Sequence, residues 1–564
     1  MKRLLIIAGI VLGVLVVAVV MAPLFIDADS FRPDLEKKLS DSLGRTVHVG
    51  KLDASILSGG AKASNISISD DPAFSKGPFL QASSVQIGLE LIPLIFSHQV
   101  KVTSLSVQSP DIVLLKNSAG KWNFSNLGAA AGKGKGRAAS GNSSVPESSM
   151  AISTASVFGD AQSKNSGSSA PELSVDKFEI VNGTLRVGQS AGHTASHESV
   201  YKNVRLLARN ISETTVIPFT LLADTPGGGS LDVDGTAGPL NAEDSARTPM
   251  DAKLTLEHAD LARSGFFDAN SGLAGIVDFD GKVKSDGRKL HSEGRAKANN
   301  LKMMKGGAPS SQPVSLDYKS DFGLESQTGT LSAQAHTGGS TATVSGTMDA
   351  HGEKTLAHLK ILAQKMAVND IEGILPAFGV TLPSGASLQG GTINADLAAE
   401  GPLDRLVITG PVKLSDTKLT GYDLSSKLGA VAALAGIRPS SETLIQTLSS
   451  ALHVSPEGIN ADNILLDVPS LGQITGAGVM GSNSSLNFKM LMKPAGAMAQ
   501  MAGGLGALAG NKGIPFLIEG TTANPIFRPA LGSTIKSLIP GANDSGNQGG
   551  LGGVLGGLFG KKKK

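Results

Sequence analysis

Apolar and polar residues alternate with a period of two in segment after segment of this chain. Successive side chains of a β-strand point to opposite faces, so this alternation is typical of strands with one apolar and one polar face. The clearest runs are Val85/Ile87/Leu89/Leu91, Val100/Val102 and Leu486/Phe488/Met490/Met492. The pattern predicts a chain built mainly from amphipathic strands.

Pairs of turn-forming residues predict how these strands are connected. They are Asn182-Gly183, Asp234-Gly235, Asp280-Gly281 and Asp286-Gly287. Both positions of such a pair tolerate positive φ, as tight hairpin turns require. Consecutive hairpins give an antiparallel meander, so we expect a mostly β fold with one elongated, curved antiparallel sheet.

A few short helices are expected beside the sheet. Phe31, Leu35, Leu39 and Leu43 recur every four residues and form one helical stripe, with Ser30 as N-cap and Gly44 at the C-terminus. We expect this helix to pack its stripe on the first strands. Two further stripes predict helices in the C-terminal part, namely Leu424/Leu428/Val431/Leu434 and Leu444/Leu448/Leu452.

The apolar faces of the strands have three possible arrangements: a sandwich, a closed barrel or an open, taco-like groove. Aromatic residues make up only 4% of the chain and glycines number 70, so few large side chains can seal a thick core. This composition favours a groove that holds flexible acyl chains. The predicted lining residues are Val85, Ile87, Leu89, Leu91, Val100, Val102, Leu486, Phe488, Met490 and Met492.

Acyl chains need no polar site motif for binding. Burial contributes about 0.8 kcal/mol per CH₂, so a chain of roughly 16 carbons contributes on the order of 10 kcal/mol before ordering losses. No metal or cofactor is predicted, because cysteine is absent and no nucleophile, zinc or phosphate-loop motif occurs in a suitable context. The spacing of His193 and His197 and the acidic residues before Gly235 and Gly281 are read as loop and turn features. We therefore expect no enzymatic activity.

The first residues predict a membrane anchor. Lys2 and Arg3 precede an uncharged run from Leu4 to Ile26, which as a helix would be roughly 34 Å long and would cross a hydrocarbon core of about 30 Å. A cleaved signal peptide is the alternative, but its apolar region is normally about 7–15 residues long. The predicted anchor residues include Leu4, Ile6, Leu12, Leu15, Val19, Leu24, Phe25 and Ile26.

Charge predicts topology and excludes one class of partner. The basic residues before the span favour a cytoplasmic N-terminus, which places the bulk of the chain across the membrane. Apart from Lys2, Arg3 and the four terminal lysines, 44 basic residues stand against 48 acidic ones. This body has no basic excess to neutralise phosphates, so nucleic acid is not an expected partner.

Composition and pattern divide the chain into seven parts. We expect a cytoplasmic tip (1–3), the anchor (4–26), an N-terminal β module (27–128), a flexible Ala/Gly/Ser/Lys linker (129–170), a central β-rich segment (171–400), a C-terminal β module (401–530) and a Gly/Leu-rich tail ending in lysines (531–564). The linker has too few apolar residues to order itself.

Several short motifs resemble the bacterial AsmA family. Those of the N-terminal module are Phe25-Ile26-Asp27, Phe31-Arg32-Pro33, Leu43-Gly44-Arg45-Thr46-Val47, Leu89-Glu90-Leu91-Ile92-Pro93-Leu94 and Gly120-Lys121-Trp122-Asn123-Phe124, where Trp122 is expected to plug the core at a strand end. Those of the C-terminal module are Gly401-Pro402-Leu403, Thr409-Gly410, Leu419-Thr420-Gly421-Tyr422-Asp423-Leu424, Ile514-Pro515-Phe516-Leu517-Ile518-Glu519-Gly520-Thr521 and Pro525.

The resemblance implies an AsmA-like, chorein-related periplasmic lipid-transfer protein. Such a protein is anchored in the bacterial inner membrane by one span and conducts phospholipid along an apolar β-groove towards the outer membrane, supporting outer-membrane lipid homeostasis. Its implied partners are phospholipids, the inner membrane and outer-membrane proteins or other envelope-bridging factors. A non-catalytic scaffold or regulator of outer-membrane protein assembly and targeting to the membrane is the alternative. About 20–25 strands would give a groove roughly 100–120 Å long.

Overall fold

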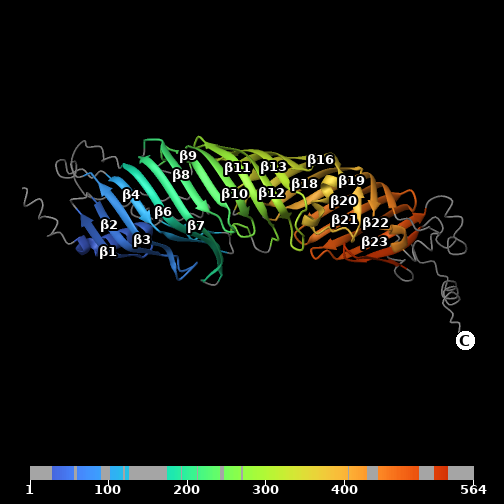
Figure 1. The fold of residues 1–564 in the computed structure, drawn as a ribbon, viewed down its shortest axis with the longest axis horizontal. Coiled ribbons are helices and arrows are strands. Elements are labelled where there is room, and N and C mark those ends of the chain that lie inside the picture. Colours follow the sequence, from blue (N-terminus) through green and yellow to red (C-terminus); the bar gives the residue numbers. More distant parts are fainter. Residues whose placement is uncertain are drawn as a thin grey trace, which may run out of the picture.

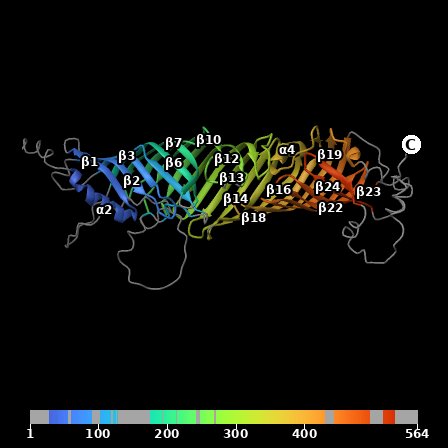
Figure 2. The same ribbon diagram turned by 90° about the horizontal axis from the view of Figure 1, so that it is seen from below.

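The computed structural model shows a single elongated sheet of 25 strands (Figure 1). It describes residues 28–55, 60–90, 102–117, 121–125, 127, 174–191, 194–212, 214–241, 247–267, 271–352, 354–403, 405–428, 442–494 and 513–530. The first and last strands lie at opposite ends of the long axis, and the sheet is strongly twisted between them (Figure 2). The predicted mostly β architecture is confirmed.

The strands follow one another along the chain with few helices between them. The N-terminal and central strands are β1 (Val47–Ser55), β2 (Gly60–Ser69), β3 (Pro78–Leu89), β4 (Val102–Gln108), β5 (Asp111–Lys116), β6 (Val175–Ala191), β7 (Thr194–Ile211), β8 (Ile217–Asp224), β9 (Ser230–Ala237), β10 (Met250–Asp260), β11 (Ala274–Ser285), β12 (Lys289–Lys302), β13 (Val314–Gly323), β14 (Thr328–Thr337), β15 (Ser340–Asp349) and β16 (Leu356–Ala367). The remaining strands are β17 (Ser387–Gln389), β18 (Thr392–Pro402), β19 (Val407–Thr420), β20 (Glu442–Ser455), β21 (Gly458–Val468), β22 (Gly472–Gly481), β23 (Leu486–Pro494), β24 (Ile514–Gly520) and β25 (Pro525–Pro529). The helices are η2 (Ala28–Phe31), α2 (Arg32–Leu43), α4 (Val368–Glu372), η6 (Leu375–Phe378) and α5 (Leu424–Leu428).

The sheet is mixed, so the prediction of a purely antiparallel sheet is wrong at one point. Strands β4 and β5 both pair in parallel with the 17-residue strand β6, each along a different part of it. A parallel pair needs a crossover of a dozen or more residues, and the chain length between Lys116 and Val175 is enough for one. The other pairings among the described strands are antiparallel, with β16 pairing to β18 and the short β17 pairing to β19.

The register aligns the apolar residues of neighbouring strands. A continuous cross-strand row begins at Leu52 of β1 and passes through Ala63, Val85, Val107, Ile180, Leu206, Leu221, Val233, Leu254, Gly281, Gly294, Tyr318, Ala333, Val344, Ile361 and Leu397. The same row continues from β19 to β25 through Gly410, Leu452, Ala461, Gly478, Phe488, Ile518 and Phe527. We call this the apolar row, and the side of the sheet that carries it the apolar face.

Only one of the four predicted turn pairs forms a turn. Gly287 has a φ of 87° between β11 and β12, whereas the pairs at 234–235 and 280–281 lie inside strands. A Cβ at Gly281 would collide with the ring of Phe279, so this glycine makes room for an aromatic ring on the apolar face. Asn182 does have positive φ, but in a bulge of β6 where the register shifts.

Bulges of this kind recur along the sheet. Left-handed non-glycine residues lie within β2, β6, β7, β10, β12, β16, β19 and β21, at Asn65, Asn182, Asn203, Asn210, His258, Asn300, Lys365, Asp416 and Asn463. A left-handed residue in a strand bends it and increases its right-handed twist. The signal for curvature in this sequence is therefore asparagine inside an alternating run, because asparagine tolerates this conformation better than most residues.

The helix predictions are only partly confirmed. Helix α2 ends at Gly44, which has a φ of 66° as expected, but η2 precedes it and its N-cap position is Phe31 rather than Ser30. Phe31 is exposed rather than packed on the strands. Leu444, Leu448 and Leu452 lie in β20, because a spacing of four residues fits the period of two as well as a helical turn. Val431 and Leu434 lie outside the described residues.

Both edges of the sheet are blocked against further strand pairing. On β1, the outward amides of Val47 and Val49 donate to Ser40 Oγ (2.9 Å) and Glu36 Oε1 (2.7 Å) of α2. On β25, Thr521 and Asn524 exchange backbone hydrogen bonds and Ala530 N donates to Pro515 O. Asn524 and Ala530 direct their backbone N–H groups towards β24. Because this direction alternates along a strand, the backbone groups of residues 525, 527 and 529 face away from the sheet, and two of these residues are prolines without an N–H.

Replacing Pro525 and Pro529 by valine is expected to cause self-association. The double variant would present N–H groups at all three outward positions of β25, which can template pairing with a second copy. Sedimentation velocity should show dimers or larger species, while the mid-sheet control Thr343→Val stays at the wild-type mass. A double variant that sediments as the wild type does would contradict this role for the prolines.

Candidate functional site

The apolar face is accessible in the middle of the sheet. Every large member of the apolar row from Leu221 to Leu397 is half-buried. Among the described residues of β9 to β16, the buried apolar strand residues are alanines, apart from Met366 at the end of β16. Protein side chains therefore do not seal this stretch, which we call the open stretch.

The opposite face of the open stretch is polar and carries cross-strand ion pairs. Lys253 lies 3.0 Å from Asp280, Lys319 lies 3.3 Å from Glu293, and Lys360 lies 3.2 Å from Asp396. Exposed pairs of this kind contribute little stability each. Their consequence is that only one face of the sheet can take up hydrocarbon.

The C-terminal end of the apolar face is sealed. We call this packed region the C-terminal core; its buried members are Val368, Leu414, Leu428, Ile445, Val468, Leu471, Ile474, Met490, Met492, Ile514 and Phe516. Met492 is 0% exposed and Phe516 is 1% exposed. These side chains come from β19 to β24, from α4 and α5 and from the turn after β21. They cover the apolar face here, whereas the open stretch has no such cover.

One segment crosses between the two long rims of the sheet. It follows β16, comprises residues 368–381 with α4 and η6, and is called the strap. Ser484 Oγ, in the turn after β22, donates to Gly379 O of the strap (2.9 Å), and the hydroxyls of Thr381 and Thr522 lie 3.0 Å apart. Strands β16 and β22 run in opposite directions, so their C-terminal ends lie at opposite rims. The strap therefore closes the C-terminal part.

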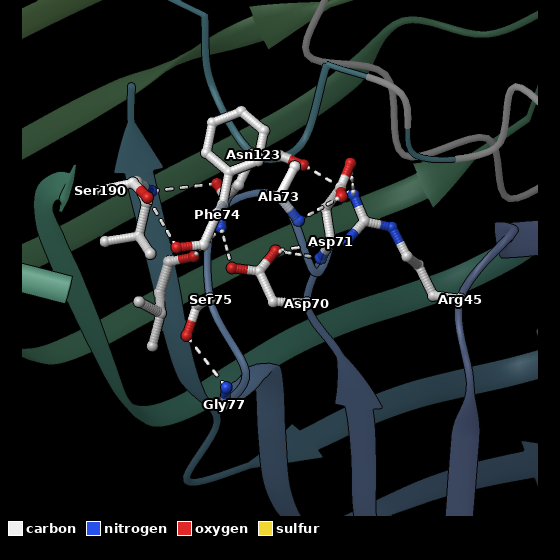
Figure 3. Close-up of polar contacts among 11 residues, drawn as sticks. Arg45, Asp70, Asp71, Ala73, Phe74, Ser75, Gly77, Asn123 and Ser190 are labelled. Atoms are coloured by element: carbon white, nitrogen blue, oxygen red, sulfur yellow. Dashed lines mark hydrogen bonds and ion pairs between the residues drawn. The ribbon is translucent and has the colours of Figure 1, made fainter. Parts of the chain in front are cut away.

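A buried polar cluster holds the N-terminal end together (Figure 3). Arg45 Nη1 lies 3.3 Å from Asp70 Oδ1, and Arg45 Nη2 donates to Asn123 O (2.8 Å). Asn123 Nδ2 donates to Asp70 Oδ2 (2.9 Å), and Asn123 Oδ1 accepts from Leu115 N (3.0 Å). The cluster thus ties the start of β1, the end of β2 and the segment after β5, and Asn123 Nδ2 also donates to Val113 O of β5 (2.9 Å).

Burial raises the pKa of the Asp70 carboxyl above 3.8, and this effect outweighs the hydrogen bond from Asn123 and the charge of Arg45, which lower it. A raised folded-state pKa adds stability below the unfolded-state pKa and loses it as pH rises. We therefore expect the stability of the wild type relative to Asp70→Asn to fall as the pH is raised from acidic to neutral values. Urea unfolding of both proteins across this range measures it, and a relative stability that rises with pH would contradict the direction.

The structure places the predicted lining residues in different surroundings. Val85 and Phe488 belong to the apolar row, Ile87 and Leu486 are half-buried on the same face, and Leu89 lies at the end of β3. Val102 is buried, and Met490 and Met492 belong to the C-terminal core rather than to the open stretch. Leu91, Val100 and the anchor residues lie outside the described residues. No helix in the described ranges is long and apolar enough to span a membrane.

Sequence reasoning missed the roles of Arg45, Asp70 and Asn123. Two of them stand in the family motifs but carried no assigned role, and Asp70 lies 53 residues from Asn123 without a motif of its own. Trp122, predicted as the plug, is half-buried and stacks on Phe124 at 5.8 Å, whereas its neighbour Asn123 is fully buried. Within the described ranges, no three His, Cys, Asp or Glu side chains gather as a metal site.

Comparison with known proteins gives one result. The search of curated proteins and the search of solved structures found no match. The model of the AsmA family matches residues 1–296, more than half of the 564 residues, and this range includes the whole of the buried polar cluster and the start of the open stretch. The chain therefore belongs to the AsmA family.

Proposed function

We propose that this protein binds phospholipid by its acyl chains on the open stretch and conducts it along the sheet from the inner membrane towards the outer membrane. AsmA membership and the large one-sided sheet fit a role in lipid transport or in the cell envelope. The observation that carries the proposal is the accessibility of large apolar side chains from Leu221 to Leu397. In water such a continuous surface would be unfavourable by about 25 cal/mol for each Å² left uncovered.

The dimensions of the open stretch suit lipid tails. Strands β8 to β18 cover on the order of 45 Å at the usual spacing between strands. One leaflet of a bilayer is about 15 Å of hydrocarbon, so the stretch has room for several lipids in file. The proposed topology, with a single N-terminal span and the sheet in the periplasm, places the N-terminal end of the sheet beside the inner membrane.

Site-specific photocrosslinking tests the proposal with matched positions. Leu331 and Val344 point to the apolar face, and their chain neighbours Ser332 and Thr343 point to the polar face. A photoreactive residue at either of the first two should capture phospholipid in cells, and one at either of the last two should not. Capture from neither position, or equal capture from both faces, would overturn the proposal. The scaffold alternative stays a prediction and expects no capture from either face.

A further inference from the structure

We infer that lipid held on the open stretch leaves sideways, through a port at the rim where the β10–β11 and β12–β13 loops meet, rather than past the C-terminal end of the sheet. This inference rests on the proposed function and adds the place of release. It follows from a closed end, from a group of exposed apolar side chains at one rim and from their continuity with the apolar face.

The C-terminal end of the apolar face is closed to acyl chains. To pass beyond β19, an acyl chain would have to displace the C-terminal core, where Met492 and Phe516 are almost completely buried. It would also have to separate the strap from the turns that hold it, including the hydrogen bond from Ser484 Oγ to Gly379 O and the contact between Thr381 and Thr522. Interiors packed in this way leave no continuous channel.

The port is formed by exposed apolar side chains on two adjoining loops. Phe266 and Phe267 of the β10–β11 loop are 56% and 45% exposed, and Met303 at the start of the β12–β13 loop is 42% exposed. The two loops touch, because a Cβ at Gly272 of the first would collide with the backbone of Lys305 in the second. The three side chains therefore belong to adjoining loops at the C-terminal ends of β10 and β12. The second of these loops also lies against the strap, because Met303 N donates to Ala377 O (3.0 Å) and Ala308 N donates to Pro376 O (2.8 Å).

Phe266 connects the port to the apolar face. The ring of Phe266 lies 6.2 Å from that of Tyr201, which is buried opposite Leu185 of β6. Tyr201 Oη donates to Ser264 O (2.8 Å), which holds the loop against β7. Burial raises the pKa of Tyr201 to about 12, so the phenol keeps this proton at neutral pH. The bulges at Asn182 and Asn203 shift the alternation of β6 and β7 by one residue, so the buried Tyr201 lies on the face of Ile180 and Leu206. Phe266 thus lies between the apolar face and solvent.

The chemistry of the port suits a phospholipid. Lys302 and Lys305 stand beside Met303, and neither forms an ion pair with another described residue. A lysine beside exposed apolar side chains can bind the phosphate of a lipid while its acyl chains pass over the apolar side chains of the port. The exposed Leu356 and Leu403 at the other rim differ, because Leu356 precedes Ala357 of the apolar face and so points to the polar face.

Two variants separate release through the port from passage through the closed end. The chain has no cysteine, so Thr381→Cys with Thr522→Cys can form a single disulfide that locks the strap. The full chain, reconstituted in donor vesicles of phosphatidylethanolamine and phosphatidylglycerol, should deliver a fluorescent phospholipid to acceptor vesicles at the same rate with the strap locked or reduced. The triple variant Phe266→Asp, Phe267→Asp and Met303→Asp should slow transfer at least about ten-fold, because acyl chains would then have to pass three carboxylates at the port.

The controls keep the outcomes distinct. Leu356→Asp with Leu403→Asp, on the other rim, should leave the rate unchanged, and a photoreactive residue at Phe267 in the otherwise unaltered chain should capture lipid even if the triple variant fails to fold. Transfer that stops when the engineered disulfide forms and returns when it is reduced would contradict release through the port. A triple variant that folds and transfers lipid at the wild-type rate would contradict it as well. Either result leaves lipid capture at Leu331 intact, whereas loss of that capture overturns the proposed function itself.

Discussion

Replacing Asp70 by alanine is expected to destabilise the N-terminal end of the sheet by about 3–5 kcal/mol, because it removes the closer of the two carboxylates beside the buried guanidinium of Arg45 and leaves Asp71 at 3.9 Å. The Asp70 side chain is fully buried and that of Arg45 nearly so. The loss also frees Asn123 Nδ2 from one of its two acceptors. Hydrogen exchange of β1 to β3 with increasing urea measures the effect where it arises.

The matched control for this prediction removes both charges. Arg45→Met combined with Asp70→Leu replaces the ion pair by apolar side chains, and such replacements are often neutral or stabilising. We expect the double variant to recover most of the stability that Asp70→Ala loses. A single variant as stable as the wild type would show that the Asp70 carboxylate contributes nothing, and a double variant as unstable as the single one would assign its effect to the hydrogen bonds rather than to the broken ion pair.

Alanine substitutions should distinguish the sealed and the open parts of the apolar face. Phe516→Ala is expected to cost about 3–5 kcal/mol, because it leaves a cavity in the C-terminal core. Leu331→Ala is expected to cost about 1 kcal/mol or less, because the half-buried side chain lies beside solvent and its removal opens no enclosed cavity. The two residues lie on the same face of one sheet, so the comparison isolates what covers them.

Chemical unfolding of detergent-purified, delipidated protein measures both losses of stability. Leu331→Ala should in addition weaken lipid capture at Val344, which lies on β15 two residues from Gly346, the register partner of Leu331. Phe516→Ala should leave that capture unchanged in the folded fraction. Similar large losses of stability at both positions would mean that protein fills the middle of the face, which contradicts an open stretch.

The alternation in the sequence predicted the strands and their apolar side well, because the period of two is local. It did not reveal which apolar runs stay open: Met490 and Met492 alternate as regularly as Val85 and Ile87, yet the former are sealed by side chains from α4, α5 and β19. The covering residues are distant in the chain. Closure by the strap depends on contacts such as that of Thr381 with Thr522, 141 residues apart, which no local pattern reports.

The wrong predictions have a common origin. The pairs Asp234-Gly235 and Asp280-Gly281 read as turns by local rules, but the neighbouring strands continue past them and the glycines admit close contacts within the sheet, as Gly281 does for Phe279. Leu444, Leu448 and Leu452 satisfy two periods at once, and pairing with β19 and β21 selects the strand. Where the sequence pattern fits both a strand and another structure, pairing with the neighbouring strands selects the strand.

The most direct test of the central claim is lipid mass spectrometry of the full chain purified in mild detergent, together with two double variants. Leu331→Asp with Val344→Asp places charges on the open stretch, and Ser332→Asp with Thr343→Asp places them on the polar face of the same strands. We predict that phospholipid copurifies with the wild type and with the polar-face variant, and is lost from the apolar-face variant while its β-sheet circular dichroism is retained. A folded wild type free of lipid, or equal lipid in the two variants, would contradict the account.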